Sequence, residues 1–440
     1  MVPFVRSRRP RRRRSVLARA RLALLALGAL AGLLVALSGC GATLRHAADD
    51  DASADVDSAS TGSCAATALE ALGHVAARVY REGVSSERTL SATRMIESSK
   101  ALRSAVEAED AGGVRAAARA LVATRHLTNL RVVRGGKVLA EIGGPALAPI
   151  SGAITDATGR QLASYVTSVW ADGGLIAETN GIAEASTVLR SDPPSGEGQT
   201  LAGAFELPEG KLPTSGTFTH DDKAYEFTSF AVSSYPNDEP LRVFVLRTTE
   251  SLQPLCGASA DDTTFNTLTR IARLIYEGEA GARTEPQIRR VQSNQALLHA
   301  VAQRDPQATR VAVEALLHEH IVRLRISAGG HVLVDDGGPY VLAPVRAPLR
   351  LHGKTIGSLL LSIQDDEGYK RLANRLAGLD VLMYMKGQLV KSTIGYSPGP
   401  VPTSGPFAYR GKAYRAYTFD AEAFPSGPLR ITTLIPLPYS

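Results

Sequence analysis

Apolar residues recur first at helical spacing and later at strand spacing, and this succession occurs twice along the chain. The stretches 66–81 and 90–108 place apolar residues three and four positions apart, which predicts amphipathic helices. A third helix is expected after Asp110, because aspartate is a favoured N-cap residue. The corresponding second-half stretches are 268–276, 288–303 and the segment that begins with the pair Asp305–Pro306.

Short alternating runs follow the helices in both halves. The segments 129–143 and 323–337 each carry a Gly-Gly pair between two runs of β-forming residues. Glycine accepts the positive φ angles of a tight turn, so each segment predicts a β-hairpin. A second hairpin is expected over 148–170 and 343–364, with its turn at "ATG" or "HG".

The second half continues with a helical stretch, 366–378, and then with further strands. Helices followed by mostly antiparallel strands predict an α+β fold, with an antiparallel sheet in each half and the N-terminal helices packed on one of its faces. The predicted closing strands span 380–387, 388–393, 412–419 and 429–435.

Matching phrases indicate that the two halves are copies of one unit. "LRVVRGGKVL" from Leu130 matches "LRISAGGHVL" from Leu324. "PTSGTFTHDDKAY" from Pro213 matches "PTSGPFAYRGKAY" from Pro402 at eight of thirteen positions. A spacing of about 190 residues is too long for a solenoid repeat, so we predict two tandem globular domains. Their predicted bounds are 64–250 and 256–440.

Residues 1–39 have the layout of an export signal. Nine arginines and no acidic residue precede Leu22, and an Ala/Leu/Gly run continues to Leu37. The run ends with "LSGC" at Cys40, which resembles the lipobox of bacterial lipoproteins. The resemblance implies cleavage before Cys40 and its acylation, which would hold the protein at the outer face of the bacterial cell membrane. The alternative is an uncleaved signal anchor.

Loss of this leader changes the charge of the protein. The chain has 49 basic and 43 acidic residues and a formal net charge of +6. Without the nine leader arginines, 40 basic residues face 43 acidic ones, which removes the main argument for nucleic-acid binding. After the leader, residues 40–63 carry the lipidated cysteine and a small, polar, acidic sequence. They predict a flexible linker with a reach of roughly 25–30 Å.

Two further cysteines, Cys64 and Cys256, each precede the first helix of one half. An exported chain meets oxidising surroundings in which disulfides form and persist. A disulfide between the two halves is one interpretation, and two free, buried thiols are the alternative.

One segment matches the nucleophile-elbow pattern G-x-S-x-G, at 395–399 with Ser397 in the middle. That chemistry needs a helix after the serine and a histidine later in the chain. Prolines follow the serine, and the last histidine, His352, precedes it. The segment therefore predicts a loop, and we expect a protein that is not an enzyme.

Metal and phosphate patterns are also incomplete. His318 and His320 flank Glu319, but residues two apart on a helix do not share a face. The G-x5-G-K pattern at 405–412 has one residue too many for a phosphate loop. We therefore predict neither a metal site nor a cofactor.

The succession of a helix pair, a short helix, a Gly-Gly hairpin and a second hairpin occurs at 66–168 and 268–363, and 410–436 adds the closing strands. It resembles the Cache family, the extracellular PAS-like sensory domains of bacteria. The resemblance covers both halves and implies a small-molecule pocket between the sheet and the loops that cover it. Ligands in this family include amino acids, carboxylates and amines.

Two departures from the family affect this reading. Each half carries its own helices, so tandem single-Cache domains fit better than one double-Cache unit. Neither a transmembrane helix nor a signalling domain precedes Ser440, so signalling through a separate membrane protein is expected. The aromatic, arginine and aspartate signature of the amino-acid-binding subgroup is not found, so the resemblance does not imply a particular ligand.

Candidate ligand residues are sought where the matching strands of the two halves differ. Ser151 follows "API" where Arg346 follows "APV". Cationic side chains of this kind would suit a carboxylate or amino-acid ligand, and Trp170, the only tryptophan, could form a pocket wall. For Trp170 the alternative is a plain core position. For every other candidate the alternative is an ordinary surface position. The second-half candidates are Arg346, Tyr340, His331 and Lys354.

Two functions are therefore compatible with the sequence. The first is a membrane-anchored sensor lipoprotein that binds a small molecule and signals through a separate partner. The second is a structural or adhesive surface lipoprotein whose duplicated fold binds no ligand.

Overall fold

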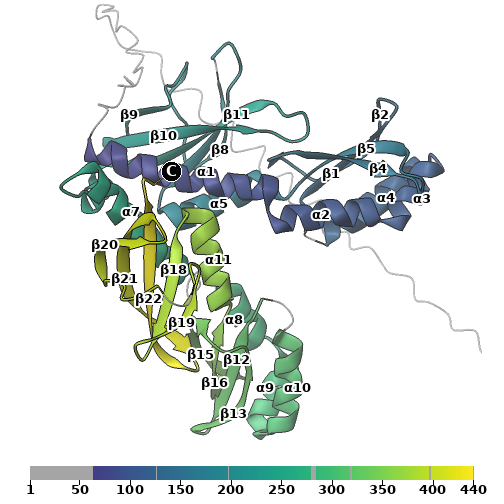
Figure 1. The fold of residues 1–440 in the computed structure, drawn as a ribbon. Coiled ribbons are helices and arrows are strands. Elements are labelled where there is room, and N and C mark those ends of the chain that lie inside the picture. Colours follow the sequence, from purple (N-terminus) through teal and green to yellow (C-terminus); the bar gives the residue numbers. More distant parts are fainter. Residues whose placement is uncertain are drawn as a thin grey trace, which may run out of the picture. The chain divides into compact units, whose positions relative to one another are not determined.

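A computed structural model shows that the described part of the chain has the predicted α+β class (Figure 1). All described residues belong to one compact unit of the chain. Cys40 and the leader lie outside the described residues, as do Ser397, His318 and Glu319. The structure describes residues 63–439 except 125, 197, 279–283, 318–319 and 396–397.

The first half opens with four helices, each started by a capping side chain. Ser63, Ser86, Ser99 and Asp110 accept a hydrogen bond from a backbone N–H of the helix that each one precedes. The stretch predicted as one helix over 90–108 is two helices, because Ser99 ends the first and caps the second. The helices are α1 (Cys64–Ser85), α2 (Glu87–Ser98), α3 (Lys100–Glu107) and α4 (Ala111–Ala123).

The strands of the first half form two main antiparallel sheets rather than one. The smaller sheet has the order β2-β1-β5-β4, and the larger has the order β8-β7-β11-β10-β9. The short strands β3 (Ala146–Leu147) and β6 (Trp170–Ala171) pair with each other. Helix α5 (Asp172–Ala183) follows β6 and connects the two sheets. The smaller sheet contains β1 (Asn129–Arg134), β2 (Lys137–Ile142), β4 (Ile150–Thr155) and β5 (Gln161–Ser168). The larger contains β7 (Ser186–Ser191), β8 (Thr200–Gly203), β9 (Ser215–His220), β10 (Lys223–Ser233) and β11 (Pro240–Thr248).

The second half repeats this succession after α6 (Thr249–Leu252) and the 3-10 turn Gln253–Leu255. Its smaller sheet has the matching order β13-β12-β16-β15, and its larger sheet runs β20-β21-β22-β18-β19 with β14 and β17 added at one end. The helices are α7 (Ala260–Gly278), α8 (Glu285–Gln292), α9 (Gln295–Gln303), α10 (Pro306–Leu317) and α11 (Asp366–Ala377). The first strands are β12 (Arg323–Ala328), β13 (His331–Gly337), β14 (Val341–Leu342), β15 (Val345–Leu351), β16 (Lys354–Ser362) and β17 (Gln364–Asp365). The last are β18 (Asp380–Met385), β19 (Gln388–Ser392), β20 (Ser404–Tyr409), β21 (Lys412–Phe424) and β22 (Gly427–Leu437).

The predicted Gly-Gly hairpins are confirmed in both halves. Gly135 and Gly136 connect β1 to β2, and Gly329 and Gly330 connect β12 to β13. All four glycines have positive φ angles, which residues with a Cβ adopt only with strain. The two hairpins therefore need glycine at these positions.

Each smaller sheet is covered by three helices and has its own core. In the first half, Leu102, Val106 and Val114 of the helices pack on Leu130 and Val132 of β1. The second half repeats this layer with residues from α8, α9 and α10 packed on β12 and β16. The smaller sheets are therefore separate packing layers that the sequence pattern did not distinguish from the larger ones.

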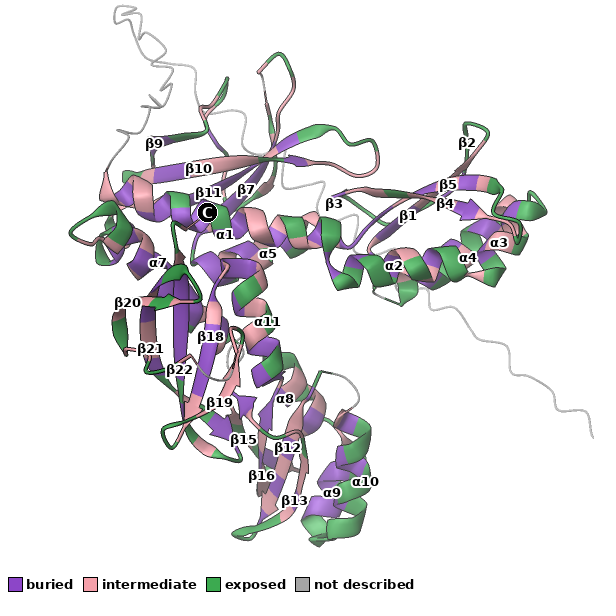
Figure 2. Ribbon diagram, viewed as in Figure 1, coloured by how far each residue is buried: buried purple, intermediate pink, exposed green. Residues whose placement is uncertain are grey.

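The larger sheets of both halves share a single core. Helices α1 and α5 of the first half and α7 and α11 of the second contact one another, and their buried residues form one cluster with strands of both sheets. Buried residues recur along α1 from Ala65 to Gly83 between less buried ones, as Figure 2 shows. Each sheet buries its inner face against helices of its own half, and the helices of the two halves pack on one another, which joins the two copies through one apolar core.

A disulfide between Cys64 and Cys256 links the two halves where this shared core begins. The two Cα atoms lie 5.5 Å apart, and the cysteines are 192 positions apart in the chain. Cys64 is the first residue of α1, and Cys256 follows the 3-10 turn that precedes α7. The disulfide interpretation of these cysteines is therefore confirmed.

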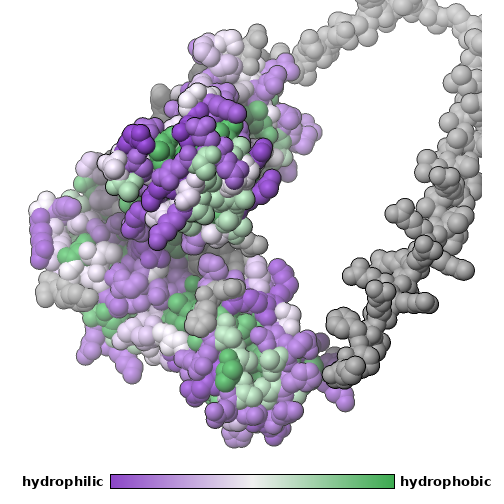
Figure 3. All heavy atoms as spheres, turned by 90° about the vertical axis from the view of Figure 1, so that its right-hand side faces the viewer, coloured by the Kyte–Doolittle hydropathy of each residue, from purple (hydrophilic) through white to green (hydrophobic). Residues whose placement is uncertain are grey.

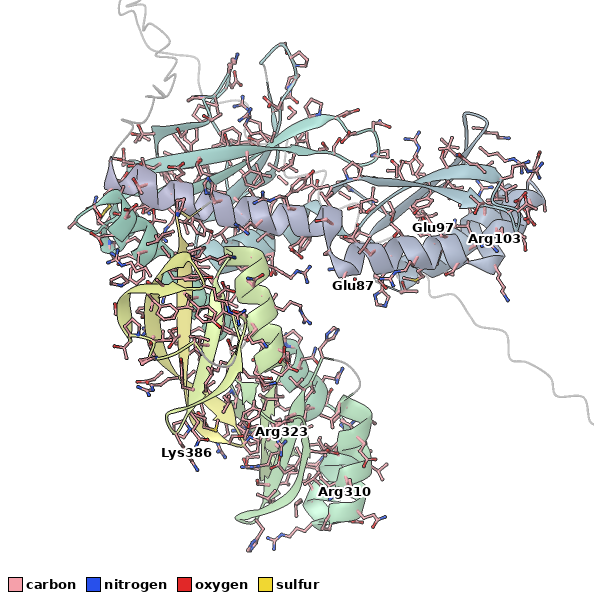
Figure 4. The ribbon with its side chains drawn as sticks, viewed as in Figure 1. Glu87, Glu97, Arg103, Arg310, Arg323 and Lys386 are labelled. Atoms are coloured by element: carbon pink, nitrogen blue, oxygen red, sulfur yellow. A yellow bond between two sulfur atoms is a disulfide. The ribbon has the colours of Figure 1, made fainter. Side chains whose placement is uncertain are left out.

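An arginine on the smaller sheet of the second half connects it to the larger one. Arg325 of β12 lies over the ring of Phe424, at the end of β21, with its guanidinium carbon 4.5 Å from the ring centroid. Asp335 accepts hydrogen bonds from Arg325 and from Arg323, at 2.7 and 2.8 Å; Arg323 is labelled in Figure 4. In the first half, Arg131 has a related place on β1 and donates to Asn237 at 2.9 Å.

Reduction of the disulfide should lower the free energy of unfolding by about 5 kcal/mol, because the bond closes a long loop in the unfolded chain. The measurement is urea unfolding of the purified protein with and without reductant. The Cys64→Ser, Cys256→Ser double variant should unfold at the midpoint of the reduced protein in both conditions. A wild-type midpoint that does not respond to reductant would contradict the structural role of the bond.

Replacing Asp335 with asparagine should destabilise the protein at neutral pH but not in acid. Burial alone would raise the pKa of Asp335, but the hydrogen bonds from Arg323 and Arg325 outweigh it and lower the pKa below its ordinary value of 3.8. The carboxylate therefore contributes stability above about pH 4, and that contribution is lost as the pH falls through its lowered pKa. We expect a deficit of about 1 kcal/mol between pH 5 and 7 that shrinks below pH 4 in urea unfolding. A deficit independent of pH would contradict the ion pairs.

Candidate functional site

Five of the six residues predicted to bind a ligand lie apart on the two smaller sheets and their connections. Ser151 and Arg346 do occupy matching positions, opposite Val166 and Leu360 in register, but both are exposed. His331 and Lys354 are exposed at the first residues of β13 and β16. Tyr340, which has a φ of 52° and is half-buried, lies between β13 and β14. The structure therefore does not bring these side chains into one site.

Trp170, the sixth, does line a cavity. Its half-buried ring contributes to a recess of about 160 Å³ with Val79 and Arg375, and the guanidinium carbon of Arg88 lies 6.0 Å from the ring centroid. Gly83 of α1 lies so close to the ring that a Cβ there would collide with it. The tryptophan therefore packs between α1 and α5 and forms one wall of a small recess.

The exposed apolar side chains do not indicate a binding surface. Val311, Val332 and Leu201 are the most exposed large apolar residues described, and they come from α10, β13 and β8. On the face drawn in Figure 3, hydrophobic residues form small patches between hydrophilic ones. Scattered apolar residues are normal on a protein surface, so these side chains do not mark a site.

A recess of about 240 Å³ lies on the larger sheet of the first half, on the face opposite the shared core. We call it the basic recess, because Arg190, Lys211 and Arg242 line it and Asp192 is the one acidic residue of its described lining. The sheet supplies the floor, and the walls come from Pro193, Pro194, Gly196, Gly198 and residues 210–212. A polar pocket between a sheet and covering loops is the kind of site that the sequence led us to expect.

Arg190 holds the walls of the basic recess onto the sheet. It is 4% exposed, on β7, and its Nη2 donates to the carbonyls of Gly198 and Gly210 at 2.7 Å each. Burial lowers its pKa, while the carboxylates of Asp192 and Glu209 act in the opposite direction. A guanidinium keeps its charge under such conditions, so the recess has a fixed positive charge at its base.

Arg242 adds a second cation directly beside Arg190. The two residues are register partners on β11 and β7, so their side chains emerge on the same face of the sheet. Nη2 of Arg242 lies 3.1 Å from Oδ2 of Asp192, and Nη1 donates to Ser229 Oγ at 3.3 Å. Asp192 thus orients Arg242 and neutralises part of the charge.

Lys211 is the adaptable cation of the basic recess. It is exposed, and within the described residues no carboxylate lies within ion-pair distance of its ammonium group. Among the described residues that line the recess, three cations face the carboxylate of Asp192, and Glu209 also acts on Arg190, so this described lining carries excess positive charge. A small anion is therefore the ligand that this lining would favour.

Glycine and proline allow the wall segment to approach the sheet. A Cβ at Gly198 would lie 2.9 Å from Nε of Arg190 and closer still to the carbonyl of Ser191. Gly196 has a φ of 81°, and Pro193 and Pro194 begin the segment. Gly198 therefore lies so close to β7 that a side chain there would push the wall away.

As far as it is described, the corresponding face in the second half carries a cluster of apolar and aromatic side chains. Tyr384 pairs in register with Arg430, just as Arg190 pairs with Arg242 in the first half. Around it, Leu382, Tyr414 and Phe407 belong to one hydrophobic cluster. The two copies have therefore diverged where one of them holds the basic recess.

Sequence reasoning missed Arg190, Lys211 and Arg242, although a signal was present. Comparing "STVLRS" at 186–191 with "DVLMYM" at 380–385 places Arg190 opposite Tyr384. Our comparison of matching strands was made on the hairpins of the smaller sheets and did not extend to this pair. Lys211 and the glycines of the wall have no strand pattern to reveal them.

Comparisons with known proteins identify no family for this chain. No protein-family model matches, and no curated protein matches. Among solved structures, a match is found to an extracellular ligand-binding receptor from Desulfohalobium retbaense DSM5692, with 12% sequence identity and a TM-score of 0.24. The match covers 42% of this chain and 39% of that one, and a likeness of this extent carries no argument about function.

Proposed function

We propose that this protein is a membrane-anchored extracytoplasmic lipoprotein that binds a small carboxylate in the basic recess of its first half. The observation that carries the proposal is the convergence of Arg190, Lys211 and Arg242 on one recess between a sheet and its covering loops. In this proposal the protein is a binding protein rather than an enzyme, and it passes its bound state to a separate membrane protein.

Size and charge support a small carboxylate as the ligand. A recess of about 240 Å³ is smaller than the pockets of drug-sized ligands, which are about 300–1,000 Å³. Arginine binds carboxylates through paired N–H donors, and the ammonium group of Lys211 can move to meet a second oxygen. The apolar side chain of Phe244 at the floor leaves room for a short hydrocarbon part.

The membrane anchor is inferred from residues 1–40 alone. The charged start, the apolar run and "LSGC" at Cys40 support export, cleavage and lipidation. Two or more acyl chains hold a protein on a bilayer stably, whereas a single chain gives marginal binding. Within residues 63–439, as far as they are described, no helix is long and apolar enough to cross a membrane.

The filled face of the second half favours a structural role for that copy. Tyr384 stands where the first half has Arg190, and its neighbours are apolar. If the first half also lacks a ligand, the alternative is a structural or adhesive surface lipoprotein. The two functions differ in whether any small molecule stabilises the folded protein.

Replacing Lys211 with methionine should abolish or strongly weaken carboxylate binding while leaving stability unchanged. A thermal-shift screen of carboxylates, amino acids and amines on the purified protein finds the ligand, and calorimetric titration measures its affinity. Loss of one charge-assisted hydrogen bond should raise Kd about tenfold or more. Lys211→Met tests this more cleanly than a change at Arg190, whose loss would also release the wall carbonyls.

Lys223→Met is the matched control, because Lys223 is exposed at the start of β10 on the same sheet. It should bind the ligand with wild-type affinity. If no carboxylate, amino acid or amine raises the unfolding temperature, the binding proposal is wrong and the structural alternative is favoured. Equal loss of affinity in both variants would also contradict binding in the basic recess.

Replacing Cys40 with alanine should release the protein from the membrane, because the acylated residue is lost. The measurement is fractionation of cells that express the wild-type or the Cys40→Ala chain, followed by immunodetection. Retention of the variant in the membrane fraction at the wild-type level would contradict the lipid anchor and favour a signal anchor.

A further inference from the structure

A second cationic cavity lies where the two halves meet. It has a volume of about 510 Å³ and is lined by Arg247, Arg270 and Arg273 together with Glu184 and Tyr417. We call it the arginine recess. Arg247 belongs to β11 of the first half, the other two arginines to α7 of the second half, and Tyr417 to β21.

The helix places two of these arginines on one face. Arg270 and Arg273 are three positions apart on α7, so their side chains are neighbours on the helix surface. Arg273 lies over the rings of Tyr417 and Phe419, with its guanidinium carbon 5.9 and 5.8 Å from their centroids. Stacking on two rings holds the guanidinium in place while leaving its N–H donors at the edge of the plane.

The charge of Arg270 is already compensated. Glu184 accepts hydrogen bonds from both Nε and Nη2 of Arg270, the first at 3.1 Å. Oε2 of Glu277 lies 3.5 Å from its Nη1. Arg270 therefore serves to order this part of the cavity rather than to supply excess charge.

Arg247 and Arg273 supply the excess charge. Within the described residues, neither has a carboxylate within ion-pair distance. Arg247 is held by Ser251, whose hydroxyl and carbonyl oxygens accept from its Nε and Nη2 at 3.2 and 3.0 Å. Burial lowers the pKa of Arg247. The carboxylate of Glu184 acts against this effect, and the charge of Arg270 adds to it.

The wall opposite α7 is covalently fixed. Pro254 and Leu255 line the cavity and immediately precede Cys256, which is disulfide-bonded to Cys64. Asn266 of α7 donates to the carbonyl of Leu255 at 3.3 Å. The cavity is therefore held in a defined shape by the disulfide and by a hydrogen bond across it.

We propose that the arginine recess is a second binding site, distinct from the basic recess, and that it takes a phosphate group. Arg247 and Arg273 have no carboxylate partner within ion-pair distance among the described residues, and guanidinium groups bind phosphate oxygens through paired donors. The phosphate is either that of a soluble phosphate ester or that of a lipid headgroup in the membrane to which the linker would tether the protein. Both sources present the same chemistry to Arg247 and Arg273.

The test is calorimetric titration of the purified protein with inorganic phosphate at fixed ionic strength. Arg273→Met should weaken binding about tenfold or more with an unchanged unfolding temperature, because Arg273 is exposed. Arg247→Met should weaken binding at least as much. Arg310→Met, on the remote helix α10 and labelled in Figure 4, is the matched control and should bind as the wild type does.

Lys211→Met separates this site from the basic recess. It should leave phosphate binding unchanged even if carboxylate binding is lost, and Arg273→Met should leave carboxylate binding unchanged. Equal phosphate affinity in the wild-type and Arg273→Met proteins, or no phosphate binding by the wild type, would overturn the proposal. Phosphate binding lost only in Lys211→Met would also overturn it.

The source of the phosphate is decided by vesicle flotation. Vesicles that contain phosphatidic acid should recruit the soluble Cys40→Ala chain in an Arg273-dependent manner if the ligand is a headgroup, and inorganic phosphate should compete. Binding of phosphate without recruitment supports a soluble ester. Recruitment that Arg273→Met does not reduce would contradict the site.

Discussion

The rest of the structure depends on one layer of helices buried between two sheets. Helices α1 and α5 from the first half and α7 and α11 from the second fill a single hydrophobic core, and the larger sheet of each half closes one side of it. Each fully buried leucine or valine in such a core contributes roughly 1.5–3 kcal/mol. Each larger sheet packs on helices of its own half, and those helices contact the helices of the other half, so the two halves are joined through the helix layer. The disulfide from Cys64 to Cys256 joins the two copies where this layer begins.

Because the inner faces are used for this core, the outer faces of the larger sheets are available for divergence. Arg190 lies opposite Arg242 in the larger sheet of the first half. Tyr384 lies opposite Arg430 at the matching place in the second half. A buried guanidinium needs acceptors, and the carbonyls of Gly198 and Gly210 supply them, so the covering segments remain ordered above a polar recess. Tyr384 instead packs with apolar neighbours, which gives the second face a dry cluster. The change between Arg190 and Tyr384 is one of several in the duplicated strand, and it accompanies the difference between the polar recess and the apolar cluster.

The elements with local chemical signals could be predicted from the sequence. The Gly-Gly hairpins, the helix that starts after Asp110 and the duplication all follow from turn, cap and repeat patterns. Helix α5 was not predicted, because Gly173, Gly174 and Gly181 dilute its apolar pattern. The division of each half into two sheets was also not predicted, since alternation along a strand does not tell which strands pair.

The candidate site was less accessible to sequence reasoning. It rests on long-range pairing between β7 and β11 and on two covering segments that contain no regular structure. The predicted residues Ser151 and Arg346 did occupy matching positions, but on exposed faces of the smaller sheets. A difference between two copies marks divergence, and only the fold shows whether the divergent position faces a cavity or solvent.

The most direct test of this account is a crystal structure of the protein grown with the carboxylate that stabilises it most. The account predicts density for the ligand in the basic recess, with its carboxylate oxygens within hydrogen-bond distance of Lys211 and of Arg190 or Arg242. Density only on the outer face of the second half, or an empty basic recess at saturating ligand, would contradict the assignment of binding to the first copy.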